Sequence, residues 1–412
     1  MTYLDSNNIL TELQFGFRAN MSPSDQLLLT YDYVSSSLDQ CLAVDLIYLD
    51  YQKAFDKVHH RTLLDKLFSL GIRGNLHRWL EDFLTDRKMK VVVHGSSSHS
   101  VDVLSGVPQG SVLGPTLFLI FINHVVHDLH SKFCLFADDL KLYIASPYSS
   151  YSASSETLQS DLNIVYDRSI SWGLPFSANK SSHLHFSRHH ISRPCPTTFF
   201  LAGSPIPLVQ SQRDLGITVD PSLKFHLHIR DKTQKANGIA RSILDSTLSR
   251  DPEFMTLAFT SHIRPHLDYA SVVWHSGYLG DIKLLESTQR RWTKQISGFH
   301  DLPYQERLSR SNLFSIRGRL LRADLIQVWK ILNGHCPSLE HLLTRHTGTT
   351  RGHSLKLFLP RANTDLRSRS FSIRVVNDWN SLSEYVVSAP SLPSFKARLT
   401  QTNHSLLFSP LD

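Results

Sequence analysis

The strongest constraint on the fold is the position of three aspartates at or inside apolar stretches. Asp50 ends the apolar run of residues 41–50, and Asp138 and Asp139 lie within residues 132–146. Apolar runs of this length, rich in β-branched and aromatic residues, predict buried strands. An ionised carboxylate that is buried without a partner costs several kcal/mol, which approaches the whole stability of a domain. The fold must therefore bring a cation to these strand ends.

The residues alone leave two kinds of cation open. A lysine or arginine is the commoner partner of one isolated buried aspartate, whereas three aspartates at strand ends of one domain favour a divalent metal. Carboxylate oxygens without a cluster of histidine or cysteine select Mg²⁺ or Mn²⁺ over zinc. Two such ions, about 4 Å apart, clamp the attacking and leaving oxygens of a phosphoryl transfer. Polymerases and nucleases both use this arrangement.

The charge is unevenly distributed along the 412 residues. Residues 1–220 carry a net charge of −4, and residues 221–412 carry +11. A basic half favours a nucleic-acid partner, although a merely basic surface explains it as well. The longest apolar run, Leu113 to Ile122, is about half a membrane span. With no secretory leader pattern and four scattered cysteines, we expect a nuclear or cytoplasmic protein that is not secreted and has no membrane partner.

The first 220 residues mix helical and strand patterns, which predicts an α+β sheet domain. Helices are predicted for residues 23–40, 60–72, 75–87, 113–129 and 156–172, and strands or hairpins for residues 41–50, 88–106, 132–146 and 183–188. The Ser-rich stretch 146–155 predicts a surface loop.

The pattern becomes mainly helical after about residue 221. Helices are predicted for residues 229–244, 281–298 and 316–334, and the periodicity weakens beyond residue 346. Arginine, lysine and tryptophan recur at helical spacing around Trp292 and Trp329. Such residues can grip phosphates and stack on bases, or the tryptophans can be core residues. Both interpretations stay open.

The segments around the aspartates are also recognisable together. They are LDYQKAFDKVHH (49–60), SGVPQGSVLGPTLF (105–118) and LFADDLKLY (135–143). In order and spacing they resemble three palm motifs of reverse transcriptases from non-LTR (LINE-type) retrotransposons of the jockey and CR1 groups. LQFGFRANMSPSDQLLL (13–29), GLPFSANKSSHLHFS (173–187) and RDLGITVD (213–220) resemble the flanking motifs. The similarity continues through IRPHLDYASVVWHSG (263–277) to VVNDWNSLS (375–383).

The resemblance implies a right-hand polymerase palm, built from an antiparallel sheet with helices, with partial fingers. It places fingers and palm at residues 1–220, a helical thumb or connector at 221–345 and a basic C-terminal region at 346–412. Members of this group begin with an endonuclease domain and a longer fingers segment. We expect this chain to be truncated at its N-terminus, so that it lacks the endonuclease domain and part of the fingers. Endonuclease function would then not be present in it.

The resemblance also implies roles for individual residues. Asp50 and Asp138 match the catalytic aspartates that hold two Mg²⁺ ions, with Mn²⁺ as a possible substitute, and Asp139 matches the second residue of the aspartate pair. The backbone carbonyl of Tyr51 would help to hold one metal. Lys180 matches the lysine that protonates the leaving pyrophosphate.

Further positions match the substrate pocket and the primer. Phe55 matches the aromatic gate that excludes the 2′-hydroxyl of a ribonucleotide. Residues that match the loop around the incoming nucleotide are Gly106, Pro108, Gln109 and Gly110, and those that match the primer-grip turn are Leu215 and Gly216.

Three functions remain as hypotheses. The first is an RNA-directed DNA polymerase that extends a DNA primer on an RNA template with deoxynucleoside triphosphates. The second is a catalytically inactive retroelement remnant that binds nucleic acid. The third is a two-metal nuclease, for which the motif around Gln109 has no use.

Overall fold

The computed structural model describes residues 2–7, 9–188, 197–346, 348, 352–402 and 407. The chain forms two compact units. Unit 1 contains residues 1–26 and 41–210, and unit 2 contains residues 27–40 and 211–412. No helix in the described part of the chain is both long enough and apolar enough to cross a bilayer.

A four-stranded antiparallel sheet forms the centre of unit 1. Its strand order is β6–β7–β1–β8, with the strands at Lys132–Phe136, Asp139–Ser146, Ala43–Leu49 and Ser182–Phe186. Strand β1 is central, and all of its residues are buried. This position explains why its sequence is an almost continuous apolar run rather than an alternating one.

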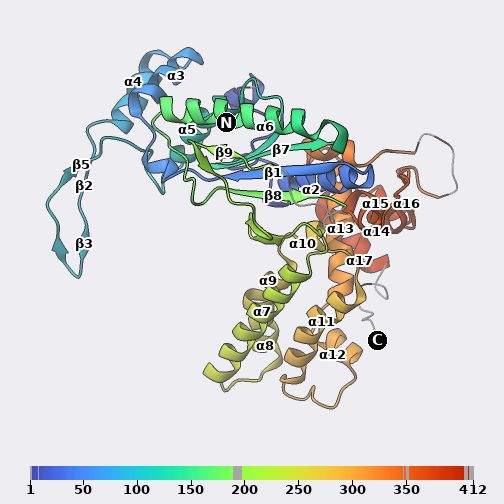
Figure 1. Cartoon of the computed structure of the whole chain (residues 1–412). Helices are drawn as coiled ribbons and strands as arrows, with labels where there is room; N and C mark the ends of the chain where they lie inside the picture. The colour runs from blue at the N-terminus through green and yellow to red at the C-terminus, as the bar shows by residue number, and fades with distance from the viewer. Residues whose placement is uncertain are drawn as a thin grey trace. The chain divides into compact units, whose positions relative to one another are not determined.

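Two helices lie along one face of this sheet (Figure 1). They are α5 (Leu113–Ile122) and α6 (Tyr151–Ser171). Helix α6 packs on β7, and its buried residues Leu158, Leu162 and Val165 recur at helical spacing. These side chains join those of α5 and β1 in one apolar core.

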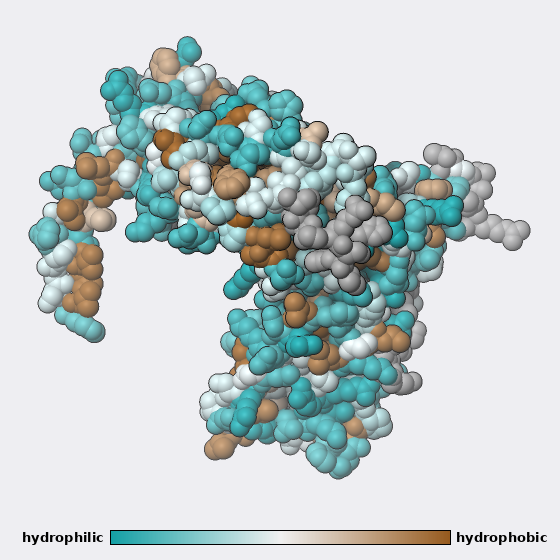
Figure 2. Space-filling view, in the orientation of Figure 1, coloured by the Kyte–Doolittle hydropathy of each residue, from teal (hydrophilic) through white to brown (hydrophobic). Residues whose placement is uncertain are grey.

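Two helices and a long β-ribbon separate β1 from α5. Helix α3 (His60–Ser69) packs against α4 (Gly74–Leu84) and against α5. In the ribbon, β2 pairs with β5 and β3 with β4, at Lys88–Met89, Val101–Asp102, Val92–Val93 and Ser96–Ser97. The strand residues of the ribbon are all exposed, and Figure 2 shows apolar residues along it.

Unit 1 also contains short elements. These are α1 (Thr2–Ser6), η1 (Ala54–Asp56), η2 (Asn123–Val126), η3 (Tyr148–Ser150), β9 (Phe200–Leu201) and β10 (Ser204–Pro205). Strands β9 and β10 form a hairpin.

Unit 2 is mainly helical and contains a β-hairpin at the start of its second segment. It contains most of α2 (Pro23–Asp39), the hairpin β11 (Gln212–Asp214) and β12 (Ile217–Val219), α7 (His226–Ser246), α8 (Pro252–Ala258), the π-helical turn η4 (Phe259–Ile263), α9 (Arg264–Asp268), α10 (Ser271–Trp274), α11 (Leu279–Lys294), α12 (Tyr304–Arg310), α13 (Ile316–Leu332), η5 (Pro337–Leu342), α14 (Asp365–Ser368), α15 (Phe371–Asn380), α16 (Glu384–Val387) and α17 (Leu392–Thr402).

Tryptophans form part of the core of unit 2. Trp274, Trp292, Trp329 and Trp379 are each at most 2% exposed. The Trp292 indole donates to the Met255 carbonyl at 3.0 Å, which satisfies its one polar group. Because Trp292 and Trp329 are buried, the core interpretation of these residues is correct, and stacking on bases is not their role.

Most predicted elements are present, and the α+β prediction is confirmed. The predicted loop 146–155 is wrong in its second half, because α6 begins at Tyr151, where Tyr151, Ser155 and Leu158 are buried on one face. The predicted helix 113–129 ends as an α-helix at Ile122 and continues only as the short turn η2.

Candidate active site

Asp50 lies immediately after β1, where the central strand leaves the sheet. Its side chain is 36% exposed, and Lys180 Nζ stands 3.4 Å from its Oδ2. The Asp50 carbonyl accepts a hydrogen bond from the Ser177 N–H at 2.7 Å. The segment just before β8 is thereby tied to the end of β1, and the predicted partners Asp50 and Lys180 are brought together.

Asp138 and Asp139 occupy the turn between β6 and β7. Asp138 is partly buried, and Asp139 begins β7 with an exposed side chain. Burial raises the pKa of Asp138, the negative charge of Asp50 raises it further, and Lys180 opposes the rise. Asp50 is therefore close enough for its charge to act on Asp138.

The donor set fits a hard divalent cation. Carboxylate oxygens are the ligands that Mg²⁺ and Mn²⁺ prefer, and a cation beside Asp50 and Asp138 would relieve their repulsion. The described residues contain one group of three metal-ligating side chains whose donor atoms all lie within 4.8 Å of one another, and it consists of Asp45, His183 and His185. Asp50, Asp138 and Asp139 are therefore not gathered that tightly.

The Ala-Asp-Asp turn is held by a segment whose role the sequence did not reveal. Gln14 is 1% exposed, and its Oε1 accepts hydrogen bonds from the N–H groups of Ala137 and Gly16, both at 2.9 Å. Residues 13–15 run parallel to β6, and the backbone groups of Leu13 and Phe15 form hydrogen bonds with those of Leu135. A Cβ on Gly16 would lie 2.4 Å from the Ala137 nitrogen. Only glycine permits this approach next to Asp138.

Tyr51 turns its side chain into the core. The ring is 2% exposed and stacks on Phe176, with ring centroids 4.0 Å apart. Burial raises the pKa of its hydroxyl well above the ordinary value, and the charge of Asp138 adds to the rise. Because the side chain is buried, only the backbone carbonyl of Tyr51 is a candidate metal ligand.

Phe55 is fixed by two other aromatic rings. It stacks on Phe118 of α5, with centroids 4.1 Å apart, and meets Phe17 edge-on at 6.0 Å. The Phe55 carbonyl also accepts from the Val107 N–H at 2.9 Å. A ring held in this way keeps one position, as a steric gate requires.

The loop around Gln109 is anchored to the segment after β1. Gly106 has φ +89°, and a Cβ there would lie 2.8 Å from the Asp56 carbonyl oxygen. Gln109 Nε2 donates to Asp56 Oδ1 at 2.8 Å. Pro108 and Gly110 flank this exposed glutamine, and open space surrounds Gly110. The structure thus gathers Phe55 with this loop, and Asp56 positions the glutamine.

The predicted primer-grip residues form the turn of the β11–β12 hairpin in unit 2. Leu215 and Gly216 have φ +42° and +89°, and Tyr269 donates its hydroxyl to the Leu215 carbonyl at 2.8 Å. The Tyr269 ring would lie 3.0 Å from a Cβ on Gly216. The motif of residues 263–277 therefore supports this turn.

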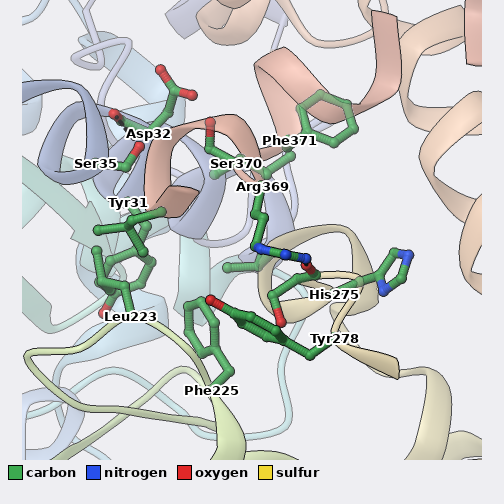
Figure 3. A pocket seen from close by; sticks show the side chains of 14 residues that line it. Tyr31, Asp32, Ser35, Leu223, Phe225, His275, Tyr278, Arg369, Ser370 and Phe371 are labelled. Carbon is green, nitrogen blue, oxygen red and sulfur yellow. Dashed lines mark hydrogen bonds between the residues drawn. The ribbon is translucent and has the colours of Figure 1, made fainter. Parts of the chain in front are cut away.

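A pocket in unit 2 is lined by residues that are already paired (Figure 3). The Arg369 guanidinium lies 4.1 Å from the centre of the Tyr278 ring and binds Asp365 at 2.9 Å. Tyr278 also donates to Asp365, at 3.0 Å. Asp32, on its rim, pairs with Arg367 at 2.8 Å. We assign no ligand to this pocket.

Comparison with known proteins decides the family. A family model described as reverse transcriptase (RNA-dependent DNA polymerase) matches residues 1–225, more than half of the chain. The chain belongs to the reverse transcriptase family. The curated relatives include enzymes of mobile elements such as jockey, which confirms the resemblance to non-LTR retrotransposon enzymes that the motifs predicted.

Two relatives illustrate the match. The chain is 24% identical over 356 residues to the probable RNA-directed DNA polymerase from transposon X-element of Drosophila melanogaster, covering 84% of this chain and 37% of that protein. It is 27% identical over 313 residues to the RNA-directed DNA polymerase from mobile element jockey of Drosophila funebris, covering 72% and 33%. The chain thus spans about a third of the length of these relatives.

One solved structure shows a partial similarity to this chain. Telomerase from Candida albicans, in complex with a fragment of telomeric RNA, covers 73% of this chain and 55% of its own at 13% identity, with a TM-score of 0.40.

Proposed function

We propose that the chain is the polymerase core of a non-LTR retrotransposon reverse transcriptase. It would transfer deoxynucleotides to a DNA 3′-hydroxyl on an RNA template. The observation that carries this proposal is the cluster of Asp50, Asp138 and Lys180 at neighbouring strand ends, inside a region that matches the family. Asp50 and Asp138 would hold two Mg²⁺ ions together with the carbonyl of Tyr51, and Mn²⁺ is a possible substitute.

The chemistry is a nucleotidyl transfer. The 3′-oxygen loses its proton and bonds to the α-phosphorus, and the bond from that phosphorus to the pyrophosphate oxygen breaks. Bound divalent ions supply the positive charge that stabilises this transfer. Lys180 would donate a proton to the leaving pyrophosphate, and Asp50, 3.4 Å away, holds the ammonium group in place. Asp139 is exposed and would face the primer end.

The loop around Gln109 would shape the nucleotide pocket. Gly106, Pro108, Gln109 and Gly110 lie beside Phe55, whose ring is fixed by Phe118. A ring in that position would exclude a 2′-hydroxyl and so select deoxynucleotides. Replacing it by a smaller side chain (Phe55→Val) should raise the relative use of ribonucleotides at least about tenfold, because one or more kcal/mol of steric exclusion is removed. Single-nucleotide extension with matched dCTP and CTP measures this ratio.

The family roles of the remaining regions stay proposals. Residues 1–220 would supply partial fingers and palm, with the primer-grip turn Leu215–Gly216 near the end of this region. Residues 221–345 would supply a helical thumb or connector, and residues 346–412 a basic C-terminal region. RNA template and DNA primer would bind the basic half of the chain. We expect the protein in the nucleus or the cytoplasm.

Primer extension tests the proposed activity. A DNA primer annealed to an RNA template would be incubated with Mg²⁺ and deoxynucleotides, with the Asp138→Ala/Asp139→Ala variant beside the wild type. Extension by the wild type alone is the expected result. Equal extension by both proteins, or by neither, would overturn the proposal.

The second candidate function is a catalytically inactive remnant that binds nucleic acid. The net charge of +11 on residues 221–412 favours it. It requires that neither protein extends the primer, while both bind the RNA–DNA hybrid with an affinity that falls as salt rises. Binding that is unchanged at high salt would count against it.

A further inference from the structure

A second group of polar side chains is buried in the sheet of unit 1, away from the strand ends. Asp45 on β1 lies directly opposite His185 on β8, and His183 lies two residues before His185. Cross-strand partners and residues two apart on a strand share one face of a sheet. The three side chains therefore meet on the same face, that of Ile47 and Leu49, which belong to the apolar core.

Both imidazoles converge on one oxygen. His183 Nε2 is 2.8 Å and His185 Nδ1 is 2.7 Å from Asp45 Oδ1, and the donor atoms of the three residues lie within 4.8 Å of one another. Asp45 and His183 have side chains only 1% exposed, and that of His185 is 11% exposed. No other group of three His, Cys, Asp or Glu residues in the described part of the chain meets this criterion.

Aromatic rings pack against the two histidines of this group. Phe199 meets the His183 ring edge-on, with centroids 4.9 Å apart, and Tyr151, at the start of α6, meets the His185 ring at 6.1 Å. Phe199 is fully buried, and Tyr151 is 7% exposed. The ring orientations are therefore constrained, and the small exposure of His185 marks the side from which an ion or a water molecule could enter.

The donor set and its spacing suit one class of ion. Two imidazole nitrogens and one carboxylate oxygen are typical ligands of Zn²⁺ and neighbouring first-row metals and are poor ligands for Mg²⁺. Metal–ligand bonds of about 2.0–2.1 Å in a tetrahedron place the donors about 3.3 Å apart. The two nitrogens need to withdraw from Asp45 Oδ1 by only about 0.5 Å to admit the ion. Each ring proton can move to the other nitrogen of its imidazole.

We propose that Asp45, His183 and His185 form a binding site for a zinc-class divalent ion, distinct from the magnesium site of the polymerase. Asp45 precedes Asp50 by five residues along the same extended segment. Five residues of a strand span about 16 Å, so the two sites are that far apart along this segment. The bound ion holds β1, which leads into Asp50, against β8, which follows Lys180. Its fourth ligand is a water molecule on the exposed side of His185. This binding does not require that the chain polymerises DNA.

Cobalt substitution tests the site with the whole chain. The protein is stripped with a chelator, titrated with Co²⁺ and examined by visible absorption, with Zn²⁺ then added to displace the cobalt. We expect one Co²⁺ per chain with the intense d–d bands of a tetrahedral ion, loss of those bands on adding Zn²⁺ but not on adding Mg²⁺, and a higher Tm with Zn²⁺. Failure to bind Co²⁺ stoichiometrically would overturn the proposal and leave a hydrogen-bonded trio.

Variants locate the ion. Asp45→Asn and His185→Gln should each abolish the bands, since each removes one ligand while nearly preserving side-chain volume. Two controls should keep them: His94→Gln, in the exposed turn of the ribbon, and Asp138→Asn, in the catalytic cluster. Bands that survive in both ligand variants would place the cobalt elsewhere and refute the assignment.

X-ray absorption on the wild-type protein makes the test independent of variant folding. The expected zinc environment contains two histidine nitrogens and two oxygens, one from Asp45 and one from water. A shell that contains sulfur, or three or more histidines, would exclude this site even if every variant misfolded.

Discussion

Two carboxylates, Asp324 in unit 2 and Asp138 in unit 1, are compensated differently. In unit 2, Asp324 forms two hydrogen bonds with Arg374, at 2.9 Å to Nε and 2.8 Å to a terminal nitrogen. In unit 1, Asp138 lies near Asp50, and a nearby lysine, Lys180, is 3.4 Å from Asp50 and acts on Asp138 only through its charge. Burial raises the pKa of both Asp324 and Asp138, and each has one carboxylate that adds to the rise (Asp378 and Asp50) and one cation that opposes it. Arg374 opposes the rise at Asp324 by charge and by hydrogen bonds, whereas Lys180 opposes the rise at Asp138 by charge alone.

This difference in compensation distinguishes an ion pair that serves the fold from a group of charges that forms a binding site. A carboxylate that serves only the fold is neutralised by a geometrically matched cation from the same chain. Two carboxylates that lie close together, without enough positive charge nearby, lower the stability of the fold. Such an arrangement is typical of a site where a bound ligand supplies the missing charge. The two regions should therefore respond in opposite ways when their aspartates are replaced.

Asp138→Asn should have the largest effect, and on activity alone. Primer extension is expected to fall by about 10³-fold or more, because Asp138 is a proposed metal ligand and its loss would remove several kcal/mol of charge stabilisation. The free energy of unfolding, measured by urea titration, should stay the same or rise slightly, since the repulsion from Asp50 is removed. Parallel loss of stability and extension would break the comparison.

Asp324→Ala should show the reverse pattern in unit 2. Removing the carboxylate leaves Arg374 buried without its partner, and we expect the free energy of unfolding to fall by about 3–5 kcal/mol. Glu306→Ala, which removes an exposed partner of Arg310, is the matched control and should cost less than about 1 kcal/mol.

The double variant Asp324→Leu/Arg374→Met sharpens this result. It should regain part of the lost stability, because both members of the Asp324–Arg374 pair are removed together, whereas the carbonyls of Arg369 and Val272 lose a donor. A single Asp324→Ala variant as stable as the Glu306→Ala control would show that the pair is not structural.

Gly16→Ala should reduce extension by roughly 10–100-fold. The new Cβ would lie 2.4 Å from the Ala137 nitrogen, so the turn that carries Asp138 must shift, and displacements of about 1 Å cost catalysis this much. Gly280→Ala is the control, because a Cβ there meets nothing within 4 Å. Extension by the Gly16 variant that equals the control would show that the turn does not position Asp138.

The sequence predicted the strands and the aspartates at their ends, but not the residues that hold these strand ends in place. Asp50 and the Asp138–Asp139 pair were predicted because a charge in an apolar run has a physical cost that is visible in the sequence. Asp45 carries the same signal, four residues into its run, but its partners His183 and His185 lie far along the chain. Only the register of β1 with β8 brings them together.

Gln14 shows a second limit. A polar residue in a loop has no periodicity, and its burial against Ala137 depends on a parallel pairing of residues 13–15 with β6 that no local pattern specifies. The start of α6 was missed because Ser-rich segments favour turns, whereas burial of Tyr151 against the sheet favours the helix. In each case tertiary contacts override local preference.

His228 extends the comparison to a buried base, whose effect on stability is smallest at neutral pH and grows as the pH falls. It is 1% exposed, and its Nδ1 accepts from the Thr218 N–H at 3.0 Å, which requires an unprotonated nitrogen. Burial lowers the pKa of His228 to about 3, and Lys232 adds to the effect. In the unfolded chain His228 binds a proton below about pH 6.5. In the folded chain His228 binds one only below about pH 3. Stability should therefore fall as the pH drops through this window.

His228→Gln isolates this contribution. Glutamine can accept the Thr218 hydrogen bond through its Oε1 but does not titrate, so urea unfolding at several pH values between 6.5 and 3 should show a shallower decline than the wild type. The difference in slope should reach at most about 1.4 kcal/mol per pH unit. Equal slopes would mean that His228 is protonated in the folded protein. In that case unit 2 would tolerate a buried charge beside its hairpin with incomplete compensation, as unit 1 does at Asp138.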